Sequence, residues 1–142
     1  MSWGETIYLR NIIEKHIGVA ASDEVLAVLV TDRFQLGNSS YEYISEFKSN
    51  ANGTIRLSAE VDGYKGNVYF KLISGDGNEM ENSYTVSTSE LEVAKVDFNV
   101  KKGVTYSLQM KSSASSGSLS HMYARNIKVC GSNSDPTLIV KE

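Results

Sequence analysis

Apolar and polar residues alternate along much of the segment from Gly53 to Ser74, and this alternation predicts two β-strands. Because successive side chains of a strand point to opposite faces, each strand should bury one face and leave the other in water. The turn at 62–66 supplies two glycines, which can take a positive φ, so we predict a hairpin. Such a face needs a second layer to cover it. Its apolar positions are Ile55, Leu57, Ala59, Val61, Val68, Phe70 and Leu72.

The same alternation recurs on both sides of this pair. Over 41–48 it predicts a strand with Tyr41, Tyr43 and Phe47 on one side. A second hairpin is predicted around the turn at 101–103, since alternating runs stand directly before and after it. The remaining predicted strands lie at 84–88, 94–100, 104–110, 123–130 and, unless the tail is loose, 137–140.

About eight strands at spacings near ten residues, with no helices between them, are typical of an antiparallel sandwich or barrel. We therefore predict an all-β fold, an antiparallel two-sheet β-sandwich of the jelly-roll kind, with one N-terminal α-helix. The continuously apolar run from Val25 to Val30 is ambiguous, because Ser22, Asp23 and Glu24 are able to cap a helix there. The run is short and rich in valine, which favours a buried strand.

Residues 4–17 give the one clear helix pattern, and Gly18 is placed to end the helix. A helix of three or four turns is marginal alone in water, so it should dock on the sandwich or on copies of itself. We assign 1–21 to this helix and a hinge that extends to Ser22, and 22–142 to the sandwich domain. The predicted docking or oligomer contacts are Trp3, Leu9, Ile12, Ile13 and Ile17.

Composition limits the classes of function. With 142 residues and 41% hydrophobic content, the chain is long enough for a single domain with a core. The net charge of -3, with acids and bases interspersed, disfavours binding to nucleic acid or to an anionic membrane. A single cysteine, Cys130, excludes an internal disulfide and a thiolate metal cluster. No apolar stretch approaches the roughly 20 residues of a membrane span, and we expect no signal peptide.

Catalytic chemistry finds little support in the sequence. His16 and His121 are the only histidines, and neither has a companion at metal-ligand spacing. Nucleophile, phosphate-binding and metalloprotease motifs are absent. The turn region 74–82 holds oxygen ligands of the kind calcium takes, but it lacks the ordered spacing of a calcium loop, so a plain turn is favoured. We expect no enzyme activity, no metal and no cofactor.

Tyrosines are the candidates for ligand binding. Tyr64 stands at a turn, and Tyr69 falls on the face opposite Val68, Phe70 and Leu72. An exposed aromatic ring beside polar groups is able to stack on the apolar face of a pyranose while the sugar hydroxyls find polar partners. The alternative is a tyrosine half-buried under a neighbouring strand or at a subunit contact.

Three parts of the sequence together resemble a known group. They are SWGETIYLRNIIEKHIG at the N-terminus, NGTIRLSAEV followed by VYFKLISGDG in the centre, and KKGVTYSLQM followed by YARNIKVCG. The combination resembles small β-sandwich proteins of the tails and baseplates of phages and prophages of Gram-positive bacteria, and RNIKVCG at 125–131 is its most specific part.

The resemblance implies a non-enzymatic structural tail protein that presents a host-surface-binding sandwich. It implies a homo-oligomer or other tail proteins as partners, and a location in the virion or, before assembly, in the bacterial cytoplasm. The alternative hypothesis is a carbohydrate-binding module that recognises a cell-surface or cell-wall glycan through exposed tyrosines such as Tyr64 and Tyr69.

Overall fold

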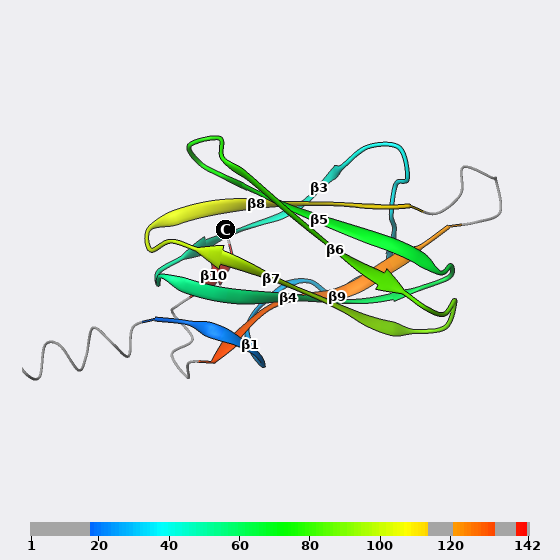
Figure 1. Ribbon diagram of the computed structural model, residues 1–142, viewed down its shortest axis with the longest axis horizontal. Coiled ribbons are helices and arrows are strands. Elements are labelled where there is room, and N and C mark those ends of the chain that lie inside the picture. The colour runs from blue at the N-terminus through cyan, green and yellow to red at the C-terminus, as the bar shows by residue number, and fades with distance from the viewer. Residues whose placement is uncertain (1–17, 114–120, 133–138, 142) are drawn as a thin grey trace, which may run out of the picture.

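The computed structural model describes residues 18–113, 121–132 and 139–141, and these form two facing antiparallel β-sheets (Figure 1). The all-β, two-sheet prediction is confirmed, while its jelly-roll detail stays a prediction. The predicted N-terminal helix and its contact residues Trp3, Leu9, Ile12, Ile13 and Ile17 lie outside the described residues. No helix in the described part is long and apolar enough to cross a membrane.

Each sheet contains five strands among the described residues. The first sheet has the order β1-β9-β4-β7, with β2 also paired to β9, and the second has the order β10-β3-β8-β5-β6. The strands of the first sheet are β1 (Ala20–Val30), β2 (Phe34–Gln35), β4 (Gly53–Asp62), β7 (Glu92–Val100) and β9 (Tyr123–Ser132). Those of the second are β3 (Glu42–Ser49), β5 (Gly66–Ser74), β6 (Glu79–Val86), β8 (Val104–Ser112) and β10 (Ile139–Lys141).

Both predicted hairpins are wrong, because their strands belong to different sheets. β4 pairs with β7 and β9, whereas β5 pairs with β6 and β8. The turns at 62–66 and 101–103 therefore carry the chain from one layer to the other (Figure 1). Alternation predicts which face of each strand is buried but not which strand lies beside it. Here the apolar faces of β4 and β5 face each other, so each covers the other.

The core fills the space between the two sheets. The apolar positions predicted for β4 and β5 are all buried, and β7, β8 and β9 contribute their alternate residues to the same core. The largest side chains that are fully buried include Phe47, Phe70, Met110 and Met122. The sandwich prediction was thus correct about the burial of these strands.

The run from Val25 to Val30 is a strand, as predicted, but most of it is not buried. β1 lies at the edge of its sheet, its pairing with β9 is interrupted by three register shifts, and Val25 and Val28 are exposed. The strand also begins at Ala20, inside the segment predicted as a hinge. Val19, within the same segment, holds it in place, because its side chain is buried and its backbone bridges Gly53.

Val19 and Gly53 form a clasp between the start of β1 and the start of β4. The Val19 N–H donates to the Asn52 carbonyl at 3.0 Å, and the Thr54 N–H donates to the Val19 carbonyl at 3.0 Å. Gly53 lies between these bonds with φ of 143°, and a Cβ there would meet the backbone of Val19. Only glycine fits this close approach of two backbones.

A β-bulge changes the predicted face of β3. Tyr43 pairs with Gln109 and Ser45 pairs with Leu108, so Ile44 is an extra residue with no counterpart on β8. Phe47 remains buried beside Tyr106, whereas Tyr43 points outward and is 60% exposed. The prediction that Tyr43 and Phe47 share one side is wrong, because the bulge shifts the alternation by one residue.

We expect Gly53→Ala to lower the free energy of unfolding by about 3 kcal/mol or more, because the added methyl group would part Val19 from β4. Gly77→Ala is the matched control: Gly77 also has a positive φ, of 91°, but its Cβ would meet open space, and we expect a cost of about 1–2 kcal/mol. Urea unfolding measures both values. Equal costs would show that the clasp does not hold the two strands.

We expect Tyr43→Ala and Phe47→Ala to differ sharply, although the two positions are only four residues apart. Phe47→Ala should cost about 3–5 kcal/mol because it leaves a cavity in the core. Tyr43→Ala should change the free energy of unfolding by less than about 1 kcal/mol, because its ring faces solvent. A loss at Tyr43 as large as that at Phe47 in urea unfolding would contradict the outward placement.

Candidate functional site

Three tyrosines come together on the outer face of the second sheet. Directly opposed residues of neighbouring strands share a face. Tyr43 on β3 opposes Gln109 on β8, which opposes Lys71 on β5, and Lys71 opposes Glu81 on β6. In the next row Lys111 opposes Tyr69. We call this surface the tyrosine face, and it consists of Tyr41, Tyr43, Tyr69, Lys71, Glu81, Gln109 and Lys111.

Lysine amines pack against two of the three rings. The Lys71 Nζ lies 4.3 Å from the centroid of the Tyr41 ring, and the Lys111 Nζ lies 4.7 Å from the same centroid. The Lys111 Nζ is also 5.4 Å from the centroid of the Tyr69 ring. These cation–π contacts, each worth about 0.5–1 kcal/mol at an exposed site, fix Tyr41 and Tyr69 relative to each other.

Acidic groups balance part of this positive charge. Lys71 forms ion pairs with Glu79 at 3.6 Å and with Glu81 at 3.4 Å. Burial raises the pKa of Tyr41 above its ordinary value, and the nearby Glu81 and Tyr69 raise it further. Tyr41 therefore stays a neutral phenol at physiological pH. The face combines neutral rings with donors and acceptors of hydrogen bonds.

Tyr43 is the ring most open to a ligand. It has the largest exposed fraction of the three, and it borders a hollow of about 440 Å³ between the end of β1 and the start of β3. Thr31, Asp32 and Lys141 are among the polar residues that line this hollow. The exposed ring of Tyr43 thus belongs to the tyrosine face and also borders a hollow that polar and apolar residues line.

The predicted ligand-binding residues have separate locations. Tyr69 is part of the tyrosine face. Tyr64 lies in the turn between β4 and β5, and in the described part of the chain no hydrogen bond, ion pair or ring contact joins it to that face. Sequence reasoning did not select Tyr41 and Tyr43 as ligand contacts. It placed both on the side of Phe47, and nothing in the alternation indicates the bulge at Ile44.

Neither His121 nor Cys130 is part of the tyrosine face. Within the described residues, no group of three or more His, Cys, Asp or Glu side chains is placed to hold a metal ion. The His121 ring is hydrogen bonded to the Gln35 amide at 3.0 Å, and His16 lies outside the described residues. Cys130 is buried, and burial raises the pKa of its thiol.

Comparison with known proteins identifies solved structures with a similar fold. No family model matches the chain, and no curated protein matches it. Among solved structures, a carbohydrate-binding module (CBM6cm-2) from Cellvibrio mixtus lichenase 5A, in complex with cellotriose, has a TM-score of 0.50 at 9% identity, with 74% of this chain and 96% of that chain covered. The CBM22-1 xylan-binding domain from Paenibacillus barcinonensis has a TM-score of 0.45 at 8% identity, with 79% of this chain and 97% of that chain covered.

The likeness to the Cellvibrio module establishes a shared β-sandwich fold and, at this identity, nothing about the ligand. The relation to phage tail and baseplate proteins, which the sequence resemblance implies, stays a prediction. What this chain shares with the Cellvibrio module is the two-sheet architecture.

Proposed function

We propose that this protein is a non-catalytic module that binds a glycan through the tyrosine face. The observation that carries the proposal is the outward position of Tyr43, which the bulge at Ile44 places on the same face of the sheet as Tyr69. An aromatic ring held in water without a packing role is available for a ligand. The β-sandwich fold that the chain shares with the Cellvibrio module, a structure in complex with cellotriose, is compatible with this proposal but does not carry it.

The chemistry of the face fits a sugar chain. The C–H side of a pyranose ring packs on the Tyr43 ring, which removes apolar surface of both from water. The Gln109 amide, opposite Tyr43 on the next strand, both donates and accepts hydrogen bonds, as sugar hydroxyls require. Glu81 and Lys111 add an acceptor and a donor within the same two rows of the sheet.

The shape of the face suggests that it binds along a chain. The row from Tyr43 to Glu81 crosses four strands of one sheet, so its side chains lie along a line. Neighbouring strands lie about 4.8 Å apart, so the row offers contacts over roughly 15 Å. Such a length accommodates several sugar units. If the chain is a tail-associated protein, this glycan would lie on the surface of the host cell.

A glycan array first identifies a polysaccharide that the protein binds. We then expect that soluble polysaccharide, when it is added to a native gel, to slow the migration of the protein. Tyr43→Ala should weaken the binding by about 2–10-fold, which corresponds to the ~0.5–1.5 kcal/mol of one aromatic contact. Tyr69→Ala should weaken it as well, because Lys111 would lose one of its two rings. Tyr64→Ala is the matched control and should leave the affinity unchanged, because Tyr64 lies at a turn.

Two results would oppose the proposal. The first is the absence of binding to any glycan on an array that covers neutral and acidic cell-surface polymers. The second is binding that Tyr64→Ala weakens and Tyr43→Ala does not, because the glycan would then lie at the turns. Urea unfolding of each variant shows whether a loss of binding is a loss of folding.

A further inference from the structure

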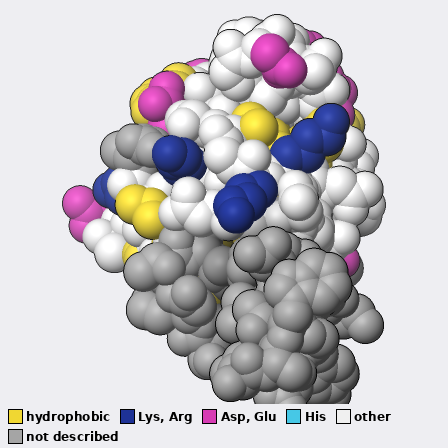
Figure 2. All heavy atoms as spheres, turned by 90° about the vertical axis from the view of Figure 1, so that its left-hand side faces the viewer, with side chains coloured by type: hydrophobic (Ala, Val, Ile, Leu, Met, Phe, Trp, Pro, Cys, Tyr) yellow, Lys and Arg dark blue, Asp and Glu magenta, His cyan; other side chains and the backbone are white. Residues whose placement is uncertain are grey.

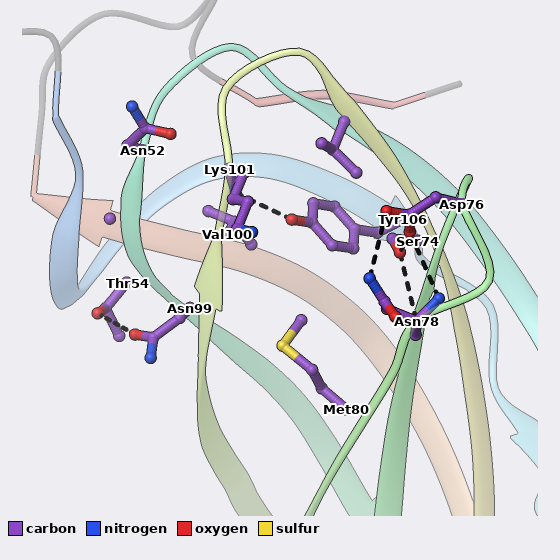
Figure 3. A pocket seen from close by; sticks show the side chains of 12 residues that line it. Asn52, Thr54, Ser74, Asp76, Asn78, Met80, Asn99, Val100, Lys101 and Tyr106 are labelled. Atoms are coloured by element: carbon purple, nitrogen blue, oxygen red, sulfur yellow. Dashed lines mark hydrogen bonds between the residues drawn. The ribbon is translucent and has the colours of Figure 1, made fainter.

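A cavity of about 510 Å³ opens between the two sheets, away from the tyrosine face. The edge strands β6 and β7 are joined where the Asn82 side-chain amide donates to the Asp97 carbonyl at 3.1 Å. Toward the β5–β6 and β7–β8 turns these strands diverge (Figure 1), and Figure 3 shows the residues around the gap. We call this gap the wedge. Its volume lies within the roughly 300–1,000 Å³ that is common for small-molecule sites.

The floor of the wedge is mainly aliphatic. Met80, Val100, Val104 and Tyr106 line it. The Lys101 N–H donates to the Tyr106 hydroxyl at 2.9 Å, which holds the ring in place (Figure 3). Since only 3% of Tyr106 is exposed, it cannot offer its face to a sugar ring. The floor suits a small alkyl group, such as a methyl, better than a flat pyranose face.

The rim of the wedge is polar and carries both signs of charge. The Ser74 hydroxyl and the side-chain amide of Asn78 both donate to Asp76, the latter at 3.2 Å (Figure 3). The Ser74 bond, followed by a bond from the Asn78 backbone, holds the pKa of Asp76 below its ordinary range, so this carboxylate is charged at neutral pH. Lys101 also lines the wedge. Figure 2 shows this end of the molecule, where basic and acidic side chains both reach the surface with hydrophobic ones between them.

Asn99 and Val100, at the end of β7, line one wall of the wedge. This strand is the last in its sheet, so in the described part of the chain one side of its backbone pairs with no other strand. Backbone groups on such an edge are donors and acceptors in the geometry that complements an amide. An amide that ends in a methyl group would therefore bond to the edge of β7 and place its methyl group near Met80.

We propose that the wedge binds the acetamido group of an N-acetylated sugar unit. The aliphatic floor receives the methyl group, the edge of β7 receives the amide, and the rim around Ser74, Asp76 and Asn78 receives sugar hydroxyls. The balanced charges of the rim favour a neutral sugar over a strongly charged one. This site goes beyond the proposed function, because its residues are separate from those of the tyrosine face and either site works without the other.

The test is a titration of the full chain with N-acetylglucosamine, followed by ¹³C-methyl NMR of Met80, Val100 and Val104. We expect saturable shifts of these signals. Glucose, which lacks the acetamido group, should shift them only at concentrations about tenfold higher, because the amide contacts and the methyl packing are missing. Equal affinity for the two sugars, or no shift with N-acetylglucosamine, would overturn the proposal.

Two variants separate this site from the tyrosine face. Met80→Trp fills the wedge and should weaken the binding of N-acetylglucosamine at least tenfold, read from the valine methyl signals. Tyr43→Ala should leave these shifts unchanged even where it abolishes retention by a polysaccharide. If Met80→Trp binds as well as the unmodified chain, the wedge is not the site. Should Met80→Trp fail to fold, the comparison of the two sugars on the unmodified chain still decides the question.

Discussion

The structure depends on the burial of one face of each long strand against strands of the opposite sheet. Successive strands such as β4 and β5 do not cover their apolar sides by lying next to each other in one sheet. They lie in different layers, and their apolar sides meet across the core. The turns at 62–66 and 101–103 make these crossings. Because the apolar faces of the strands in both sheets are buried in the same core, the outer faces of the sheets are not needed for packing.

The sequence predicted burial better than it predicted pairing. Ile55, Leu57 and Phe70 were assigned to the core correctly, since a period of two is a local property of the chain. The partner of each strand is decided elsewhere, by which apolar surface is available in the other layer, and the residues of a turn do not report that. For this reason the glycines Gly63 and Gly66 predict a hairpin, although the turn that holds them connects one sheet to the other.

The candidate site was only partly predictable, because the register between neighbouring strands is not a local property of the sequence. Tyr69 was found because its strand alternates without interruption and places it opposite the core. Tyr43 was missed as a ligand contact because one additional residue, Ile44, reverses the outward and inward positions that precede it in β3. No residue type in this part of the sequence distinguishes the bulge from regular strand. It becomes visible only when the register of β3 against β8 is known.

The clasp at Val19 and Gly53 has a mechanical consequence. Its two backbone hydrogen bonds lie ahead of β1, so a force applied from the N-terminal side loads them before it reaches the pairing of β1 with β9. That pairing is interrupted by three register shifts, so the clasp protects an edge strand that is irregularly held along its length. While the clasp holds, the N-terminal side transmits force to β4 in the middle of the first sheet, and the outer face of the second sheet is left undisturbed.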